Sequence, residues 1–437
     1  MEHQDVEVLA VGAGPSNLAL GVALEELAPE ELAGDTLLVE QGDCVAWQRG
    51  MLLPWSQSQV SFIKDFVTLR NPRSRFSFLN YLHENDRLDD FVNLGTFTPY
   101  RSEISGYHRW VAESFEKVRV RYNSRCTSVE PRRDGAGALV GWLVRLADGS
   151  TVGARHLVFG SGRDALVPEV FAGLPAAKVV HSTQYLPRIA ELSKDLPYRV
   201  VVVGGAQSAG ELFHSVQDEL PHCRPTWVMR SIGLNSYENS KFTNELFYPS
   251  FTDEFFAADA PARTQLLREM HRTNYAGLAP DFLETLYRQF YNQRLTGGDR
   301  LAMRTMTDIT AARMDDDEVV LELSNRRTGE REELRADLVL LGTGFVPEMP
   351  RLLRDLAADL GVQHFDVTRA YRWDLGQDTA ATVHLQGVNE ATHGISDSLL
   401  SVLARRSSEI TADLLARRGT APGVLIPSQG TAAPAAA

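Results

Sequence analysis

Val6-Glu7-Val8-Leu9-Ala10-Val11-Gly12-Ala13-Gly14-Pro15-Ser16-Asn17 is the stretch that decides the fold. Its first six residues are mostly apolar and β-branched, which is typical of a buried strand. The following residues, 18–27, keep an apolar face at helical spacing. Glycine turns join strands to helices in many folds, but a strand, a glycine turn and a helix in this order indicate the first βα unit of a dinucleotide-binding domain.

The residue types in this turn predict how it would hold a dinucleotide. Gly12 permits the tight turn, and Gly14 lets the backbone approach a pyrophosphate at the N-terminus of the helix. Asn17 takes the place of the third glycine of the usual fingerprint. Glu40 ends the apolar segment 36–39 and is the acidic residue expected to bind a ribose hydroxyl, although the interval exceeds the usual ~20 residues.

The same pattern returns about 190 residues later, where an apolar strand leads into Gly204-Gly205-Ala206-Gln207-Ser208. Ala206 stands where the second glycine is usual, which narrows the space for a pyrophosphate. Residues 226–230 predict a further strand that ends in Arg230, at the position where the first unit has Glu40. An acid suits a free ribose hydroxyl and an arginine suits a 2′-phosphate, although a solvated strand end explains Arg230 equally well. Two units together favour one FAD and one NADPH.

Composition excludes several classes of protein. The chain has 437 residues, 43% of them hydrophobic and 23% charged, which is typical of a globular protein with two or three domains. The net charge of −13 argues against a protein that tracks nucleic-acid phosphates. No apolar run reaches the ~20 residues that span a membrane, and the N-terminus lacks a signal pattern. Cys44, Cys126 and Cys223 lie far apart, form no metal motif, and suit a cytoplasmic protein.

The predicted fold class is α/β, with two Rossmann-like dinucleotide-binding domains and a small, mostly helical, substrate-binding insertion. We expect helices at 76–83 and 107–118, two helices in the insertion at 261–271 and 281–295, and a final helix from His393 to about Arg417. The predicted division is 1–190 and 336–418 for the FAD domain, 191–230 and 299–335 for the NADPH domain, 231–298 for the insertion, and 419–437 for a disordered tail.

Protein-based catalytic groups are not evident in the sequence. Carboxylate pairs, serine triads and metal-ligand spacings do not stand out, so bound cofactors would carry the reaction. Reduced flavin passes electrons either to oxygen or to a disulfide. Because the chain has no Cys-x-x-Cys, oxygen is the better supported acceptor.

Motifs spread along the chain make it resemble the flavin-dependent N-hydroxylating monooxygenases of siderophore biosynthesis, above all the L-ornithine N5-monooxygenases. The resemblance runs from about Val6 to Glu409. The motifs are Gly12-x-Gly14-Pro15-x-Asn17-Leu18, Trp47-x-x-Gly50-Met51-Leu52, Ser61-Phe62-Ile63-Lys64-Asp65-x-x-Thr68-Leu69-Arg70-x-Pro72, Gly204-x-x-Gln207-Ser208-Ala209, Asn244-Glu245-x-Phe247, Thr273-Asn274-Tyr275, Gly342-Thr343-Gly344 and Thr392-His393-Gly394-x-Ser396-Asp397-x-Leu399-Leu400-Ser401.

The resemblance implies a role for each site residue. Lys64, Asn244, Asn274 and Ser401 would bind the amino-acid substrate, with Lys64 on its α-carboxylate. The FAD residues would be Gly12, Gly14, Pro15, Asn17, Glu40, Trp47, Gln48, Gln59, Cys126, Ser398, Leu399 and Leu400. The NADP residues would be Gly204, Gln207, Ser208, Arg230, Asn274 and Tyr275. In such enzymes NADPH reduces FAD, oxygen adds at flavin C4a, and the hydroperoxide gives one oxygen atom to the neutral side-chain amine.

Three substitutions beside the expected flavin and substrate positions leave the acceptor open. Gln48 replaces a common histidine, Ser58 replaces a common methionine, and Trp55 is bulky where smaller residues are usual. The alternatives are hydroxylation of lysine, 2,4-diaminobutyrate or a diamine, an NADPH oxidase or reductase that releases peroxide, and a non-catalytic nucleotide-binding protein. The partners expected are a small amine and O2, with no nucleic acid and no membrane. The resemblance also implies a homotetramer.

Overall fold

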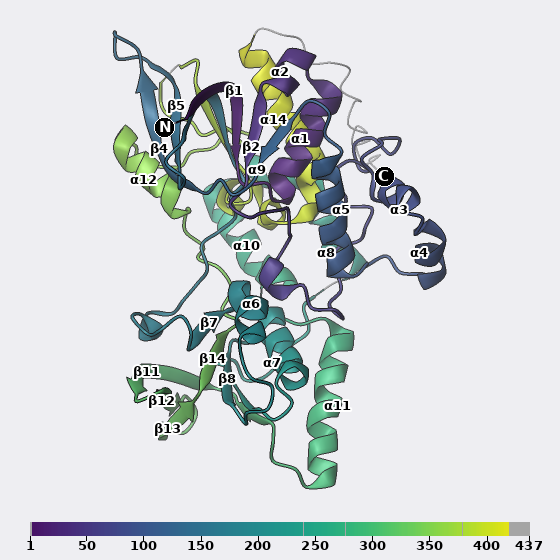
Figure 1. Cartoon of the computed structure of the whole chain (residues 1–437), viewed down its shortest axis with the longest axis vertical. Coiled ribbons are helices and arrows are strands. Elements are labelled where there is room, and N and C mark those ends of the chain that lie inside the picture. The colour runs from purple at the N-terminus through teal and green to yellow at the C-terminus, as the bar shows by residue number, and fades with distance from the viewer. Residues whose placement is uncertain (1, 239, 276, 378, 419–437) are drawn as a thin grey trace.

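Two parallel sheets form the framework of the molecule. The computed structural model describes residues 2–238, 240–275, 277–377 and 379–418. The first sheet and its helices occupy one end, the second sheet occupies the other, and helix α10 lies between them (Figure 1). The predicted α/β fold class is confirmed.

The first sheet has the strand order β3-β2-β1-β6-β5-β4, with β15 also paired to β6. Strands β1, β2, β3, β6 and β15 run parallel, whereas β4 and β5 form an antiparallel extension. The bounds are β1 (His3–Val11), β2 (Thr36–Val39), β3 (Arg119–Arg121), β4 (Cys126–Arg133), β5 (Leu139–Leu146), β6 (Thr151–Phe159) and β15 (Thr382–Leu385).

The second half of β1, residues 8–11, is buried on both faces, which explains why this part of the strand is continuously apolar. Val8 and Ala10 face one hydrophobic cluster, whereas Leu9 and Val11 face a second one that includes side chains of α12. Helix α14 packs against α1, so α1 is apolar on most of its surface and buries residues 17–24. The helices of this half are α1 (Pro15–Leu27), α2 (Glu30–Gly34), α3 (Phe78–Glu84), α4 (Leu88–Leu94), α5 (Arg101–Glu113), α12 (Arg351–Leu360), α13 (Glu390–His393) and α14 (Leu403–Arg417).

The second sheet is parallel and has the order β10-β9-β8-β14-β7. Its strands are β7 (Val179–His181), β8 (Arg199–Val203), β9 (Arg224–Val228), β10 (Ala302–Arg304) and β14 (Leu338–Leu341), with α6 (Tyr185–Ala190) and α7 (Gln207–Glu219) beside it. The predicted bounds at 190 and 336 are therefore wrong, because β7 and β14 were assigned to the first domain. An apolar strand that ends in Gly-x-Gly suits either parallel sheet, and only pairing decides between them.

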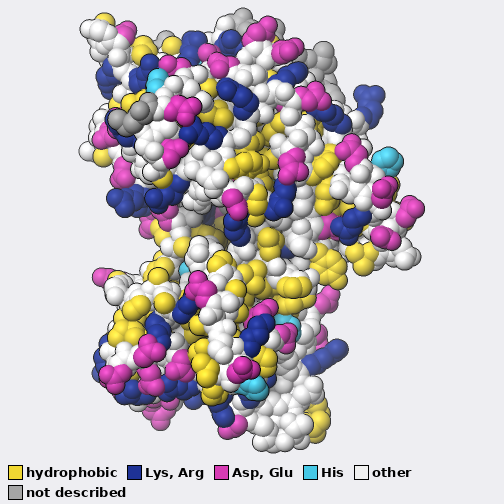
Figure 2. Space-filling model, viewed as in Figure 1, with side chains coloured by type: hydrophobic (Ala, Val, Ile, Leu, Met, Phe, Trp, Pro, Cys, Tyr) yellow, Lys and Arg dark blue, Asp and Glu magenta, His cyan; other side chains and the backbone are white. Residues whose placement is uncertain are grey.

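The segment 231–298 is helical, as predicted, and holds α8 (Lys241–Glu245), α9 (Pro249–Ala257), α10 (Ala260–Asn274) and α11 (Pro280–Thr296). A three-stranded antiparallel sheet follows, formed by β11 (Thr307–Asp315), β12 (Glu318–Asn325) and β13 (Arg331–Ala336). On the face shown in Figure 2, hydrophobic side chains gather across the waist between the two ends of the molecule, whereas charged side chains cover the ends.

Two predicted helices differ from the observed ones. Helix α5 spans Arg101–Glu113, six residues ahead of the predicted start. The final helix begins only at Leu403, because Gly394 has φ +83° and Leu399 is extended, so the chain from 395 to 402 forms two short 3₁₀ turns instead. The predicted disordered tail, 419–437, lies outside the described residues.

Candidate active site

The first glycine turn joins β1 to α1 and leaves its outer side open. Gly12 has φ +88°, and a Cβ there would lie 3.0 Å from the carbonyl oxygen of Gly160, the residue directly after the neighbouring strand β6. Gly14 is the cap of α1 and Pro15 is its first residue. A Cβ on Gly14 would meet only the Gly160 oxygen, at 3.8 Å. The glycines therefore provide both the tight turn and the close backbone approach that a pyrophosphate requires.

Asn17 lies beneath this turn. Its amide nitrogen donates to the carbonyl oxygens of Val11 (3.0 Å) and Gly12 (2.8 Å), and its amide oxygen accepts from Gln386 Nε2 (2.8 Å). The residue is fully buried. Its side chain thus shapes the turn from below, while only its backbone remains for a ligand at the open side.

Glu40 bridges the turn and the loop after β2. Its carboxylate accepts from the backbone N–H of Ala13 (2.9 Å) and of Gly42 (2.8 Å). The backbone oxygen of Glu40 accepts from Ser124 N (2.7 Å), which brings Cys126 and the start of β4 to the same edge. Burial raises the pKa of the Cys126 thiol to about 12, so Cys126 stays protonated and is no nucleophile.

The loop after Glu40 crosses from the first half of the molecule to the second. Trp47 donates its backbone N–H to Ser105 Oγ (3.0 Å), and Gln48 adopts a left-handed conformation with φ +54°. Gly50 fits where no other residue would, because its Cβ would lie 2.2 Å from the carbonyl oxygen of Thr183. Gln59, further along this loop, is exposed. The segment 47–50 is therefore held by Ser105 of the first half at its start and by close packing against Thr183 of the second half at its end.

Lys64 and Ser401, which are 337 residues apart, meet in the structure. Lys64 Nζ donates to Ser401 Oγ at 3.2 Å, and the same ammonium lies 5.0 Å from the centre of the Tyr248 ring. Burial lowers the pKa of Lys64, since desolvation disfavours its charged form. This half-buried ammonium, which donates to a neutral hydroxyl, is well suited to an incoming carboxylate.

The turn that carries Lys64 is held by Asp65. The Asp65 carboxylate accepts from the backbone N–H groups of Val67 (3.0 Å), Thr68 (2.6 Å) and Phe78 (2.8 Å), and from Thr68 Oγ1. Burial raises the pKa of Asp65 even though these hydrogen bonds oppose the shift. Asp65 was not among the predicted site residues, yet the Asp-x-x-Thr spacing is typical of such a capped turn.

The two asparagines predicted to bind the substrate come from the helical insertion. Asn244 is exposed on α8, and the backbone N–H of Phe247 donates to its carbonyl oxygen, which starts the turn that carries Tyr248 to Lys64. Asn274 is the last residue of α10 and is half-buried. The insertion therefore reaches Lys64 through the Tyr248 ring.

Tyr275 connects the end of α10 to the loop that precedes α14. Its hydroxyl donates to the Glu390 carboxylate and lies 3.0 Å from Ser398 Oγ. Glu390 also pairs with Arg163 at 3.0 Å. Burial, followed by the charge of Glu390, raises the pKa of Tyr275 to about 12. A residue predicted for NADP and one predicted for FAD are thus in direct contact.

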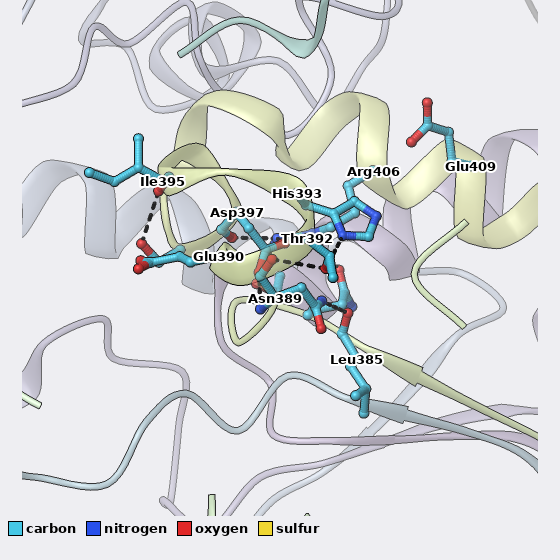
Figure 3. A network of polar contacts seen from close by, with 12 residues as sticks. Leu385, Asn389, Glu390, Thr392, His393, Ile395, Asp397, Arg406 and Glu409 are labelled. Atoms are coloured by element: carbon cyan, nitrogen blue, oxygen red, sulfur yellow. Dashed lines mark hydrogen bonds and ion pairs between the residues drawn. The ribbon is translucent and has the colours of Figure 1, made fainter. Parts of the chain in front are cut away.

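A buried polar network lies in the segment just before residues 398–400, and Figure 3 shows Asp397 and Arg406 within it. Arg406 on α14 donates to Asp397 Oδ1 at 2.8 Å, and both side chains are almost fully buried. Arg406 also donates to Ser16 Oγ (2.8 Å) and to Gln386 Oε1 (3.1 Å), so the network reaches the first glycine turn. Leu399 and Leu400 are half-buried above it.

The second glycine turn lies at the ends of β8 and β14. Gly204 has φ +136°, and a Cβ there would lie 2.3 Å from the carbonyl oxygen of Gly342. Ala206 is the cap of α7, and Gln207 and Ser208 open that helix. Arg230 is exposed two residues after β9, on the side of Asp308, whose pKa is lowered chiefly by Arg326 and also by Arg230.

The open turns fit two dinucleotides, and the described residues offer little else. The described chain holds no group of three or more His, Cys, Asp or Glu side chains able to bind a metal ion. Its helices, as far as they are described, include none long and apolar enough to cross a membrane. Two glycine turns on separate sheets, together with a pocket lined by Lys64 and Leu400, define a protein built to bind two dinucleotides.

Comparison with known proteins gives the family. Residues 4–347 match the model of the L-lysine 6-monooxygenase/L-ornithine 5-monooxygenase family, so the chain belongs to it. The chain is 37% identical to an L-ornithine N(5)-monooxygenase of Pseudomonas aeruginosa over 93% of both chains.

Two solved structures share the whole fold. Ornithine hydroxylase PvdA from P. aeruginosa superposes with a TM-score of 0.88 and 36% identity, over 95% of this chain and all of that one. The ornithine N-hydroxylase of Kutzneria sp. 744, solved with reduced FAD, NADP+ and L-ornithine, has a TM-score of 0.88 and 33% identity, over 95% of this chain and all of the other. The predicted membership of the N-hydroxylating family is confirmed.

Proposed function

We propose that this chain uses FAD and NADPH to hydroxylate the side-chain amine of L-ornithine, giving N5-hydroxy-L-ornithine. The observation that carries the proposal is the contact between Lys64 and Ser401, next to the loop 398–400 and faced by the insertion. Bound FAD would supply the chemistry: it would take the hydride of NADPH and make dioxygen the source of the transferred oxygen atom. The protein's own task is to hold the amine at the flavin and keep water away.

Lys64 binds the α-carboxylate of the substrate in this proposal. The ammonium is already partly desolvated, as the lowered pKa of Lys64 indicates, so an arriving carboxylate supplies the missing counter-charge. Ser401 and the Tyr248 ring hold the ammonium from two sides. Asn244 and Asn274 complete the binding of the amino-acid head, which fixes the distance from Lys64 to the reacting amine.

The reacting amine has to be neutral, although a free alkylamine has a pKa of roughly 10.4. The surroundings of Trp47 favour the neutral form, because the His108 ring packs against Trp47 with a centroid distance of 5.5 Å. Burial lowers the pKa of His108 to about 3, so this histidine is uncharged at neutral pH. A neutral, poorly hydrated wall lowers the pKa of an amine placed beside it.

The coenzyme would bind at the second turn, with Ser208 at the start of α7 and Arg230 on the 2′-phosphate. An arginine at this position distinguishes NADPH from NADH through charge-assisted hydrogen bonds. Asn274 and Tyr275 are adjacent at the end of α10, so a movement of one residue on coenzyme binding would also move the other, which is expected to face the substrate. The first turn, with Glu40 behind it, holds FAD.

The test is an amine panel with purified FAD-loaded protein. NADPH consumption, hydroxylamine and hydrogen peroxide are measured with ornithine, lysine, 2,4-diaminobutyrate, putrescine and cadaverine. The proposal requires hydroxylamine with ornithine in near one-to-one ratio to NADPH. Preference for another amine would replace the substrate and keep the reaction, whereas peroxide without hydroxylamine for every amine would show an NADPH oxidase.

The proposal extends to the biosynthetic role of the product and to the oligomeric state of the enzyme. A hydroxylated ornithine is a metal-chelating precursor, so the reaction would serve siderophore or related biosynthesis. The assembly is proposed to be a homotetramer, and light scattering of the purified protein measures its mass directly.

A further inference from the structure

A buried ion pair joins the two halves of the molecule behind the second glycine turn. Arg101, the first residue of α5, donates Nη2 to Glu211 Oε1 at 2.7 Å and Nη1 to Glu211 Oε2 at 3.0 Å. The two side chains are 7% and 3% exposed. Glu211 lies on α7, one helical turn after Gln207. Such a bidentate pair fixes both orientation and distance.

The Glu211 carboxylate also sets the orientation of Gln207. Gln207 Nε2 donates to Glu211 Oε1 at 2.9 Å, and Gln207 Oε1 accepts from the backbone N–H of Ala279 at 2.9 Å. The amide is therefore held from both ends, with one N–H and one oxygen lone pair left for a ligand. The sequence analysis placed Gln207 among the NADP residues but did not predict these two protein partners of its amide.

Three parts of the chain meet at this point. Arg101 Nη1 also donates to the carbonyl oxygen of Met51 at 2.9 Å, in the loop that carries Trp47 and Gln48. Leu278 of the helical insertion packs against Gly210 of α7: a Cβ on Gly210 would lie 2.5 Å from the Cδ2 atom of Leu278. The Glu211 carboxylate is therefore linked to the flavin-side loop through Arg101 and to the helical insertion through Gln207.

We propose that Glu211 is a positioning residue for NADP⁺: held by Arg101, it fixes the Gln207 amide at the start of α7 in register with the loop 47–51. The inference rests on the proposed function, because it takes the second turn as the NADP site. Its consequence is that coenzyme affinity depends on a contact between the two halves, at a carboxylate that itself touches no coenzyme.

The test measures NADP⁺ binding to FAD-loaded protein by calorimetry and thermal stability by melting. Glu211→Gln keeps the shape but removes the charge and leaves Arg101 and Gln207 a single acceptor oxygen. NADP⁺ binding should weaken about tenfold or more, the size expected when a hydrogen bond to a charged group is lost. Glu219→Gln is the matched control, because Glu219 lies on the same helix and pairs with Lys194 near the surface. The Glu219→Gln variant should bind NADP⁺ as tightly as the wild type does.

A merely structural role is excluded by two further variants. Arg101→Met with Glu211→Leu removes both charges, so stability should recover relative to Glu211→Gln while NADP⁺ binding stays weak. In a Gln207→Ala background, Glu211→Gln should weaken NADP⁺ binding no further, because its effect passes through Gln207. NADP⁺ affinity within twofold of the wild type in Glu211→Gln, or full additivity with Gln207→Ala, overturns the inference.

The outcomes separate this inference from the proposed function. If the wild type hydroxylates ornithine and Glu211→Gln binds NADP⁺ normally, only the positioning role fails. If Glu211→Gln binds NADP⁺ weakly but the wild type forms no hydroxylamine, only the proposed reaction fails. A wild type that binds no NADP⁺ overturns both.

Discussion

The two glycine turns share a backbone plan but differ in what holds them. In each, a glycine with positive φ lies against a glycine carbonyl at the end of a neighbouring strand, Gly12 against Gly160 and Gly204 against Gly342. The first turn is supported from within its own half of the molecule, by Asn17, Gln386 and the network around Arg406. The second is supported from outside its sheet.

Support for the second turn comes from Arg101 through Glu211 and from Ala279 through Gln207. A cofactor that stays bound through every catalytic cycle needs a rigid binding turn. The buried Arg406–Asp397 pair, which is linked to the first turn through Ser16, can provide this rigidity. A coenzyme that arrives and leaves at each cycle can instead bind where two halves of the protein meet. FAD retention and NADPH use should therefore respond to separate sets of mutations.

The largest expected effect lies at the first turn. Arg406→Ala leaves Asp397 buried without its partner, which should lower the free energy of unfolding by about 3–5 kcal/mol. FAD should dissociate more easily, because the loop 397–400 and Ser16 lose a common anchor. Denaturant unfolding and the flavin absorbance retained after gel filtration measure both.

Arg405→Ala provides the control for this change. Arg405 is the preceding residue on α14 and pairs with Glu409, which keeps Arg369 as a second partner, so the loss of Arg405 should cost about 1 kcal/mol or less. Equal destabilisation by the two substitutions would contradict the idea that the Arg406 network holds the first turn.

The next effect lies between the turns, at the proposed carboxylate site. Lys64→Ala removes the ammonium that pairs with the substrate, and a buried charge without its partner typically costs 2–5 kcal/mol. Apparent KM for ornithine should therefore rise by a factor of about 30 or more, while anaerobic reduction of FAD by NADPH stays normal. Lys194→Ala, at an exposed lysine of the second half, serves as control. Normal saturation by ornithine in Lys64→Ala would rule out this role.

A smaller effect is expected at the second turn. Arg230→Ala should weaken NADPH by about 1.5–3 kcal/mol, the usual contribution of a hydrogen bond to a charged group, and leave NADH almost unchanged. The ratio of kcat/KM for the two coenzymes measures the change. Equal losses for both would show that Arg230 is a solvated strand end and that the second turn selects its coenzyme by other residues.

The sequence predicted the first turn better than the second, for a physical reason. Residues 6–27 form a strand, a turn and a helix that are adjacent in the chain, so the fingerprint contains the whole unit. The second sheet takes β7 and β14 from distant segments, and the hydropathy of an apolar strand does not say which parallel neighbour it has. The predicted domain bounds were wrong for those two strands.

The same limit applies to the site. Lys64 and Ser401 were predicted from motifs, and the structure brings them to 3.2 Å of each other. Glu211 and Arg101 were missed, because a pair 110 residues apart leaves no periodic pattern. Asp65 could have been found from its Asp-x-x-Thr spacing, which is a local pattern. Local hydrogen-bonded turns can be predicted from the sequence, whereas pairs of residues that meet only in the folded chain cannot.

Coupling between the two turns is expected to change by a smaller amount. Asn274 ends α10 next to Tyr275, whose hydroxyl meets Ser398, so Asn274→Ala should loosen the contact between substrate and coenzyme sides. We expect NADPH oxidation to continue with about one third to one half of the product lost to peroxide, a cost of about 1 kcal/mol in positioning. Asn244→Ala should instead raise only the KM for ornithine. The hydroxylamine formed per NADPH distinguishes the two, and identical ratios would contradict the separation.

The smallest effect concerns the stability cost of the site itself. Burial lowers the pKa of Lys64 in the folded protein, so folding disfavours its charge. Between the lowered pKa and the unfolded value of about 10.4, the unfolded chain binds more protons, and the stability of the wild type rises with pH in that window. Below the window the full desolvation cost remains. Lys64→Met should therefore be slightly more stable than the wild type at neutral pH, by less than about 1 kcal/mol in the free energy of unfolding, because the lysine is only half-buried. This difference in stability should shrink as the pH rises through the lowered pKa.

Ornithine should raise the melting temperature of the wild type but not that of Lys64→Met, since a ligand stabilises only the protein that binds it. Melting curves from pH 7 to 10, with and without ornithine, measure both. A lower melting temperature for Lys64→Met at neutral pH would mean that its contacts with Ser401 and Tyr248 outweigh desolvation, and that the site between the two turns carries no stability cost.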